Sequence, residues 1–421
     1  MTHHLVSLKY GNSSISLPLP EDTRSFRFTE PESGTDRAGF VNNLIELIGA
    51  RPVGDRVSVI VADKTRLCGY PVILPWVAEV LEQKGAGQDR VTFYIAYGTH
   101  PRQSDQECVV AYGEVYNSYR FIHHDCNDRD AFIELGRTGR GTPVAIRKSL
   151  ADSSLILTIG AISHHYFAGY GGGRKLIFPG LARRDAIYAN HSLYLDRQKG
   201  ELAEGCRPGN LARNPLAEDL LEIHRMVPGY LSVHALLNSC GQVASYHFGH
   251  SYDDFLEICN KLDLCYKVET DRTFDLVLAS TGGYPKDINF IQAHKSIHNV
   301  APLVRDGGTL IMLAQCIDGT GSTNFLPYFT MGGPKETFSH LAKNYAGNGG
   351  TALAMMAKTE RINILLVTEL DEAVCKTIGV KKISASTAEE IIFDHSGSTA
   401  LAANSSMLVV GKKAQPPAPR K

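Results

Sequence analysis

Side chains that could act as acids, bases or anion ligands follow short apolar segments of this sequence. Arg66, His100, His165 and Lys175 each come shortly after such a segment. In an open α/β sheet, ligands bind beyond the carboxyl ends of the strands, so we expect these side chains to gather at one edge of a sheet. Two histidines, an arginine and a lysine at one edge would suit an anionic substrate.

The glycine-rich run 169–175 invites interpretation as a phosphate-binding loop, but it does not match the standard patterns. A Walker loop requires Ser or Thr after its lysine, whereas Leu176 follows Lys175. The Rossmann fingerprint requires a glycine where Arg174 stands. The run therefore predicts neither kind of nucleotide loop.

The segments that must position these residues have the patterns of buried strands and amphipathic helices. Apolar residues at helical spacing follow Pro71, and Ser104 with Glu107 forms a capping box, which predicts the start of another helix. Runs rich in β-branched residues predict strands at 56–62, 91–96 and 154–159. This alternation predicts an α/β fold with mostly parallel, Rossmann-like sheets.

The length of 421 residues favours more than one domain. The chain becomes polar around residues 265–272, and a new series of strands is predicted at 274–279, 309–313 and 362–367. We therefore expect two α/β domains, with residues 1–268 in the first and residues 269–421 in the second.

Composition narrows the possible partners and surroundings. The 43 Lys and Arg residues balance 44 Asp and Glu residues, which leaves no basic excess for nucleic acid. The nine cysteines include no Cys-x-x-Cys pair, which is typical of reduced structural thiols. Neither a signal peptide nor a long apolar span is evident, so we expect a cytoplasmic protein without a membrane partner.

Several motifs occur in an order that resembles a known family, the nickel-pincer-nucleotide-dependent lactate racemases, which include 2-hydroxy acid racemases and epimerases. His165, rather than His164, takes the position of the family's histidine because it directly precedes the aromatic pair. The matching segments are Asp63–Arg66, Gly98–His100, His165–Lys175, Ala189–His191 and Gly282–Pro285, followed by Gln292 and Lys295.

The resemblance implies a cofactor, a nickel pincer nucleotide, which is a pyridinium bis-thiocarboxylate mononucleotide. Lys175 resembles the lysine that attaches it covalently, and His191 resembles the histidine that ligates nickel. Asp63 and Thr65 match residues that contact the cofactor. Separate cofactor-maturation proteins are further implied partners. A soft, near-planar donor set is one in which nickel is expected.

The resemblance also implies the reaction. His100 and His165 resemble two acid/base groups, while Arg66, Gln292 and Lys295 resemble residues that contact a small 2-hydroxy acid. The 2-hydrogen would leave as hydride and return to the other face of the carbon, which avoids a carbanion beside a carboxylate. The active site is expected in a cleft between the domains, with the second domain contributing substrate contacts.

The sequence departs from the lactate-type pattern near Gln292. Ile291 stands where an aromatic residue usually precedes the glutamine, and the second half contains no Trp, because Trp76 is the sole Trp. Gly349 or Gly350 takes the place of the family's second-half tryptophan. The smaller side chain there favours a substrate bulkier than lactate. Alternative functions are a zinc-dependent hydrolase, an NAD(P)-type oxidoreductase on the same α/β frame, or a non-catalytic homologue.

Overall fold

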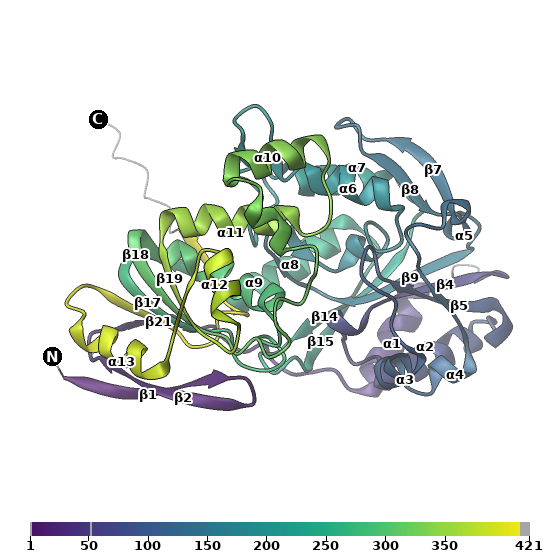
Figure 1. Ribbon diagram of the computed structural model, residues 1–421. Coiled ribbons are helices and arrows are strands. Elements are labelled where there is room, and N and C mark those ends of the chain that lie inside the picture. Colours follow the sequence, from purple (N-terminus) through teal and green to yellow (C-terminus); the bar gives the residue numbers. More distant parts are fainter. Residues whose placement is uncertain (1, 51–52, 413–421) are drawn as a thin grey trace, which may run out of the picture. The chain divides into compact units, whose positions relative to one another are not determined.

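The structure is a computed structural model that describes residues 2–50 and 53–412 (Figure 1). Its internal contacts form two compact units. Unit 2 consists of Glu30–Tyr194 and Ala203–Cys265, and unit 1 consists of the residues before Glu30, the segment Leu195–Leu202 and the residues from Tyr266 onward.

Unit 2 is built on a sheet with the strand order β15-β14-β9-β4-β5-β6. All neighbours run parallel except β14 and β15. The strands predicted at 56–62, 91–96 and 154–159 are confirmed as β4, β5 and β9. The strands are β4 (Val57–Ala62), β5 (Val91–Ala96), β6 (Arg120–His123), β9 (Leu155–Ala161), β14 (Leu231–Leu237) and β15 (Val243–Gly249).

Strands that follow β4 in the sequence lie on both sides of it in the sheet. The chain continues through β5 to β6 on one side of the sheet, and it later returns through β9 to β14 on the other side. The carboxyl ends of β4 and β9 therefore flank a topological switch point, the place where open α/β sheets bind ligands. Every residue of β4 is buried, because helices cover both faces of a parallel sheet.

Helices and small hairpins complete unit 2. The predicted capping box is confirmed, because the Ser104 side chain accepts from the Glu107 backbone and the Glu107 side chain accepts from the Ser104 backbone. The helices are α1 (Arg37–Ile48), α2 (Tyr70–Gln83), α3 (Asp105–Tyr112), α4 (Val115–Ser118), α5 (Lys148–Ala151), α6 (Arg184–Ser192), α7 (Pro215–Met226) and α8 (Tyr252–Tyr266). The hairpin strands are β7 (Phe132–Arg137), β8 (Pro143–Arg147), β10 (Ser163–His165) and β11 (Gly169–Gly171).

Unit 1 contains a parallel sheet with the order β20-β19-β18-β17-β21-β3. Its strands are β3 (Arg24–Ser25), β17 (Phe274–Ser280), β18 (Val304–Leu313), β19 (Asn363–Val367), β20 (Lys381–Ile383) and β21 (Thr399–Ala402). The other strands of the unit are β1 (His3–Tyr10), β2 (Ser13–Pro20), β12 (Leu195–Asp196), β13 (Glu201–Leu202), β16 (Lys267–Thr270) and β22 (Val409–Lys412). The helices are α9 (Phe290–Val300), α10 (Pro334–Lys343), α11 (Gly349–Arg361), α12 (Glu372–Thr377) and α13 (Ala385–Asp394).

Alternating side chains of β17 enter two separate cores of unit 1. Leu276 and Leu278 face the β1–β2 hairpin and α13, which Figure 1 shows together on one side of the sheet. Val277 and Ala279 face the core that contains α9 and α11. The period of two places successive side chains on opposite faces, so both faces of this sheet are buried.

The residues that belong to unit 1 differ from the domain division that we expect from the sequence, which is residues 1–268 and residues 269–421. The segment before Glu30 joins the C-terminal residues, because the hairpin covers β17 and β18 and because Arg24 of β3 pairs with Ala400 of β21. Leu195–Leu202 also belongs to unit 1, and Leu195 lies in its core.

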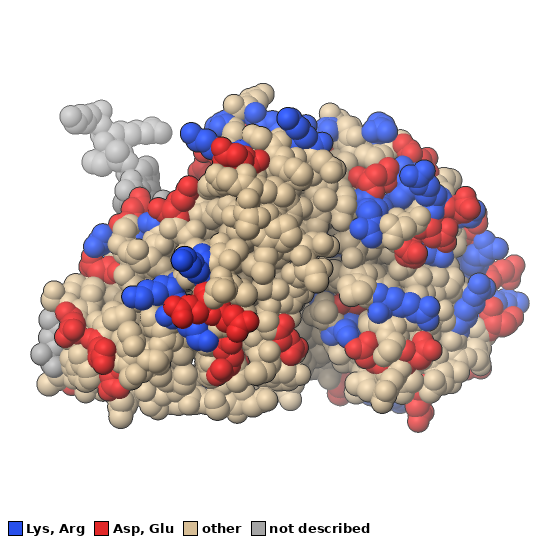
Figure 2. All heavy atoms as spheres, in the orientation of Figure 1, with Lys and Arg blue, Asp and Glu red and all other residues tan. Residues whose placement is uncertain are grey.

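The predicted α/β class with mostly parallel sheets is confirmed by both units. Charges of both signs are interspersed on the face shown in Figure 2, in keeping with a net charge of −1. Among the described residues, no helix is long and apolar enough to cross a membrane.

Candidate functional site

Asp63 lies at the carboxyl end of β4, beside the switch point of unit 2. Its side chain is buried and caps the short 3-10 helix η1 (Lys64–Arg66). Oδ1 accepts hydrogen bonds from the backbone N–H and the hydroxyl of Thr65, at 2.8 and 2.5 Å. Contact of Asp63 and Thr65 with a cofactor stays a prediction, and their contacts within the protein hold the loop after β4 in place.

His100 is oriented by Asp63. Its Nδ1 lies 2.7 Å from Oδ2 of Asp63, and Nη1 of Arg66 lies 3.5 Å from the same ring nitrogen. Burial alone would raise the pKa of Asp63, but the hydrogen bond from His100 and the charges of His100 and Arg66 hold that pKa well below its usual value. Asp63 is therefore an ionised acceptor, so Nδ1 of His100 carries a proton and Nε2 keeps a lone pair in the neutral ring.

The glycine-rich run forms a hairpin and a turn. β10 pairs antiparallel with β11, and Gly172 follows with φ of +78°. A Cβ at Gly172 would overlap the carbonyl oxygen of Ala161, so both the backbone conformation and the lack of space require glycine. The run continues into the 3-10 helix η4 (Gly173–Leu176), which holds Arg174 and Lys175 against the sheet.

Neighbouring histidines of β10 have different partners, because successive residues of a strand face opposite sides. His164 is bound to Asp263, with Nε2 at 2.8 Å from Oδ1. Nδ1 of His165 instead accepts a hydrogen bond from the backbone N–H of Ala168 at 3.3 Å. In its neutral form His165 therefore carries its proton on Nε2, which is the opposite tautomer to His100.

Lys175 extends from η4 toward the ring of Phe167, with Nζ 5.6 Å from the ring centroid. Loss of hydration lowers the pKa of Lys175 well below its ordinary value, and the charges of Arg66 and Arg174 lower it further. A lowered pKa favours the neutral amine, whose free electron pair is the form that reacts with carbonyl carbon.

His191 lies in the last turn of α6 and has its two ring nitrogens in distinct roles. Nδ1 donates to the carbonyl oxygen of Ile187 at 2.8 Å, which leaves the lone pair on Nε2. Burial, followed by the charge of Lys175, lowers the pKa of His191 to about 3. A neutral imidazole with a fixed tautomer is the form that ligates metals. The adjacent Asn190 is buried and donates to Asp219 of α7, which anchors this end of α6.

Phe167 brings three of the predicted site residues together. Its ring centroid lies 4.5 Å from that of His165 and 5.1 Å from that of His191, and Lys175 approaches the same ring. The charge of His100 also contributes to the lowered pKa of His191, so His100 lies within electrostatic range of this cluster. Unit 2 therefore gathers His165, Lys175 and His191 around one aromatic side chain.

The side chains of this cluster fit a metal whose other ligands come from a cofactor. The described residues contain no group of three or more His, Cys, Asp and Glu side chains placed to hold a metal ion. His191 supplies a single nitrogen, and the amine of Lys175 is available for a covalent bond. These two residues fit a tethered cofactor whose remaining metal donors belong to the cofactor.

The predicted substrate residues of unit 1 lie on α9. Gln292 and Lys295 are three positions apart, and Nζ of Lys295 donates to Oε1 of Gln292 at 2.6 Å. The Asn289 side chain accepts from the backbone N–H of Gln292 and so fixes the start of the helix. The helix thus presents an amide and an ammonium group on one face.

The glycine at position 349 is enclosed by its neighbours. The expectation that Gly349 or Gly350 leaves space in place of the missing tryptophan stays a prediction. Gly349 is buried at the start of α11, and a Cβ there would overlap Leu341 and approach Tyr328 to 2.9 Å. The small residue is required by close packing of α11 at that point. Ile291, by contrast, is partly buried against the core of unit 1.

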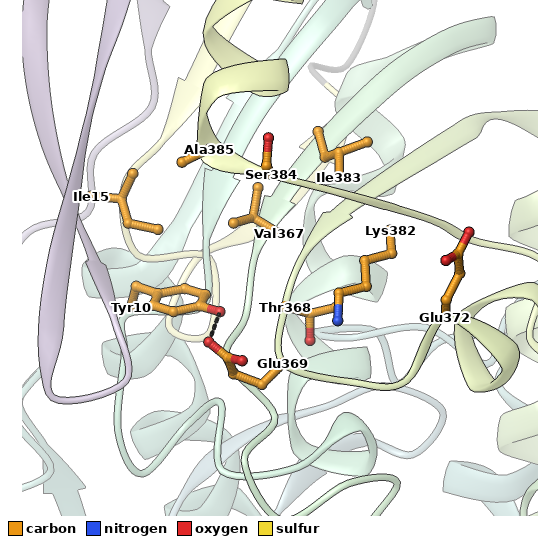
Figure 3. Close-up of a pocket in the computed structure, with 10 residues that line it drawn as sticks. All are labelled: Tyr10, Ile15, Val367, Thr368, Glu369, Glu372, Lys382, Ile383, Ser384 and Ala385. Carbon is orange, nitrogen blue, oxygen red and sulfur yellow. Dashed lines mark hydrogen bonds between the residues drawn. The ribbon is translucent and has the colours of Figure 1, made fainter.

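A separate cavity of about 530 Å³ lies in unit 1 at the carboxyl ends of β19 and β20 (Figure 3). Tyr10 of the N-terminal hairpin donates to Glu369 at 3.3 Å along its wall. None of the residues predicted to be functional lines this cavity, whose other polar walls include Glu372, Lys382 and Ser384.

Sequence reasoning missed the supporting residues of the site. Phe167 lies within the matched segment His165–Lys175, but nothing in the sequence marks its ring as the shared contact of three predicted site residues. Asp263, which binds both His164 and Tyr170, lies 99 residues beyond His164 in the chain. The local sequence around Asp263 predicts a helix, and it does not indicate a contact with a residue so far away in the chain.

Comparisons with known proteins match both halves of the chain to one family. Residues 10–203 match the family described as the lactate racemase N-terminal domain, and residues 269–354 match the lactate racemase C-terminal domain. The lactate racemase of Thermoanaerobacterium thermosaccharolyticum is 26% identical over 77% of this chain and 77% of its own length. That of Lactiplantibacillus plantarum is 28% identical over 64% of this chain and 62% of its own length.

Solved structures share the fold. The lactate racemase apoprotein from T. thermosaccharolyticum superposes with a TM-score of 0.85 at 22% identity, covering 97% of this chain and all of that one. A structural-genomics protein from Thermotoga maritima superposes with a TM-score of 0.68 at 15% identity, covering 91% of this chain and all of that one.

The fold and the matching relatives define the class of this protein, which is an α/β isomerase of the racemase or epimerase type. Both halves of the chain match the paired domains of one family in the same order. The chain belongs to the lactate racemase family.

Proposed function

We propose that this enzyme inverts the C2 centre of a 2-hydroxy acid, with a nickel pincer nucleotide attached to Lys175 and His191 as the protein's ligand to nickel. The observation that carries the proposal is the cluster around Phe167, where a lysine that favours the neutral form, a metal-competent histidine and an acid/base histidine meet. The relatives named lactate racemase support the type of reaction.

The cofactor and the protein have separate parts in this proposal. When bound, the nucleotide supplies an acceptor that can take a hydride from C2 and return it. The protein must hold the substrate, move the hydroxyl proton and keep the cofactor in place. The neutral amine of Lys175 can form the tether, and the Nε2 lone pair of His191 can complete the ligand set.

The two tautomers support complementary proton transfers. With Nδ1 bonded to Asp63, His100 can accept the substrate hydroxyl proton at Nε2 as C2 becomes a carbonyl carbon. His165 presents an N–H at Nε2 that can donate to the same oxygen. For the opposite enantiomer the roles exchange, and His165 must then move its proton to Nδ1 and give up its contact with Ala168.

Charged and polar groups that suit a carboxylate support the proposed substrate class. Arg66 is 42% exposed, and its guanidinium can bind a carboxylate through two hydrogen bonds. Gln292 and Lys295 offer an amide and an ammonium group for the carboxylate or hydroxyl of the substrate. Ile291 and the lack of a second-half Trp favour a substrate bulkier than lactate.

The proposal is tested by producing the protein together with cofactor-maturation proteins and measuring its intact mass and metal content. We expect one nickel and one added nucleotide mass per chain, both lost in Lys175→Ala. Zinc without nickel and no added mass would instead support a hydrolase.

The substrate is then identified with the loaded enzyme. Each enantiomer of lactate, malate, phenyllactate and gluconate is incubated separately, and the enantiomeric or epimeric composition is followed. We expect inversion of at least one acid bulkier than lactate. Full activity of a loaded preparation of Lys175→Ala would contradict the tether, and inversion of lactate alone would contradict the proposed substrate size.

A further inference from the structure

Arg174 is a buried cation that lacks a hydrogen-bond partner. Its side chain is 5% exposed, and Nε, Nη1 and Nη2 all lack an acceptor. Among the described residues, no carboxylate lies within ion-pair distance of its guanidinium. The five N–H groups of arginine are strong donors, so this is an unusual state for a group that keeps its charge in proteins.

Aromatic rings compensate only part of the cost of this burial. The guanidinium carbon lies 4.6 Å from the ring centroid of Phe255 and 5.4 Å from that of Tyr252. Contacts of a cation with ring faces are weaker than the hydration that a buried ion loses. A bound anion would restore both the hydrogen bonds and the charge balance.

The nearby carboxylates are already engaged by other groups. Asp254 accepts from the backbone N–H groups of His250 and Ser251, at 2.8 and 2.9 Å. Asp263 accepts from His164 and Tyr170. Arg225 adds positive charge, as shown by its effect on the pKa of His224 and Tyr252. The surroundings therefore leave the charge of Arg174 unneutralised.

Arg174 faces a small cavity between η4, β14 and the start of α8. The cavity has a volume of about 10 Å³, and His234 in its wall is buried with no partner for Nδ1. The cavity is also lined by His224, Tyr230, Ser232, His250 and Ser251. The centre of a water-sized particle can occupy only about 10 Å³ here, so we expect a small monoatomic anion to fit better than phosphate, sulfate or an organic acid.

We propose that unit 2 contains a monoatomic anion site, of the size of chloride, formed by the guanidinium of Arg174 and the imidazole of His234. A neutral water molecule could accept a hydrogen bond there, but it would leave the buried charge uncompensated. The site is distinct from the cluster around Phe167, because Arg174 contacts Phe255 and Tyr252 whereas the adjacent Lys175 contacts Phe167.

Thermal unfolding of the apoprotein tests the proposal. At constant ionic strength, methanesulfonate, which is too large for the cavity, is replaced stepwise by chloride or bromide. We expect the midpoint of wild-type unfolding to rise with the logarithm of halide concentration, because a ligand that binds the folded state stabilises it by mass action. In Arg174→Met the two salts should give the same midpoint.

A matched control and a second measurement keep the test decisive. Arg225→Met removes a nearby exposed cation and should keep the halide response. Crystals of the wild-type protein grown with bromide should show an anomalous peak within hydrogen-bond distance of the Arg174 guanidinium, a result that does not depend on the folding of a variant. Equal halide responses in wild type and Arg174→Met, or a bromide crystal without that peak, would overturn the proposal.

Discussion

Nδ1 of His100 and Oδ2 of Asp63 are 2.7 Å apart, and this hydrogen bond sets which nitrogen of the histidine is free to react. The carboxylate can accept but cannot donate, so the proton resides on Nδ1. A single carboxyl group at the end of β4 thereby fixes both the orientation and the tautomer of a histidine that follows β5.

Asp63→Asn is expected to impair catalysis by reversing this tautomer. The amide can donate to Nδ1 and so favour a proton on Nε2, where the base is required. We expect kcat of the loaded enzyme to fall by about 10²- to 10⁴-fold, the range for loss of acid/base function. Nitrogen NMR shifts of the His100 ring report the tautomer directly. Asp152→Asn, a change at an exposed aspartate, provides the control, and an unchanged kcat in Asp63→Asn would refute the assignment.

The neighbouring histidines of β10 are expected to differ sharply in their effects. His165→Gln should lower kcat of the loaded enzyme by about 10²-fold or more, because an acid/base group is removed. His164→Gln should leave kcat nearly unchanged but lower the free energy of unfolding by about 1–3 kcal/mol, through loss of the bond to Asp263. Steady-state kinetics and chemical denaturation of both variants measure the two effects. A larger loss of kcat in His164→Gln would reverse the assignment.

Gly172→Ala is expected to be more destabilising than Gly141→Ala, although both glycines have positive φ, +78° and +85°. A Cβ at Gly141 meets no atom within 4 Å, so that variant should lose about 1–2 kcal/mol from backbone strain alone. At Gly172 overlap with the Ala161 carbonyl adds to the strain, for a total of about 3 kcal/mol or more. Denaturant unfolding measures the difference, and equal losses would show that the turn relaxes freely.

A buried lysine in unit 1 is expected to make the free energy of unfolding depend on pH. Lys358 of α11 donates to the carbonyl oxygen of Ala354 at 2.7 Å. Burial, with a smaller effect of Arg361, lowers its pKa to about 7. Between pH 7 and the ordinary lysine pKa of about 10.4, the unfolded chain binds a proton at this residue that the folded chain does not bind. This residue therefore makes the free energy of unfolding fall as pH drops from about 10.4 to 7, by up to about 1.4 kcal/mol per pH unit. Below pH 7 both states bind the proton, so the full cost is present and no longer changes with pH.

Lys358→Met removes this titration and keeps a similar length of side chain. We expect the variant to be more stable than wild type at pH 7 and below, and its advantage to shrink as pH approaches 10. Denaturant unfolding across this range measures the difference, and Lys335→Met, at an exposed position, should leave the wild-type slope unchanged. A constant difference at every pH would contradict the lowered pKa.

The central strands and one helix start could be predicted because their signals are local. The β-branched run that forms β4 is buried along its whole length, and the capping box at Ser104 satisfies backbone groups of its own helix. The β1–β2 hairpin was missed, although its strands alternate in polarity and Gly11 and Asn12 form a turn signal between them. That alternation was detectable in the sequence.

Other features depend on contacts between distant residues, which no local pattern encodes. The order of the motifs pointed to His165, Lys175 and His191 as candidate site residues, but not to the ring of Phe167 that they share. The partnerless state of Arg174 follows from the positions of α8 and β14, which lie far along the chain from η4. The packed surroundings of Gly349 likewise depend on Leu341 and Tyr328 from other elements, so the sequence alone does not show whether a glycine there leaves open space.

The assignment of β3 to the sheet of unit 1 constrains how the chain can be synthesised and folded. Arg24 pairs with Ala400, so β3 cannot complete this edge of the sheet until β21, which lies far later in the chain, has been synthesised. Unit 2 lies almost wholly between these segments and can acquire its core earlier. Until then the leucines of the β1–β2 hairpin lack the strands that cover them. A fragment cut at residue 268 would keep that hairpin without its sheet.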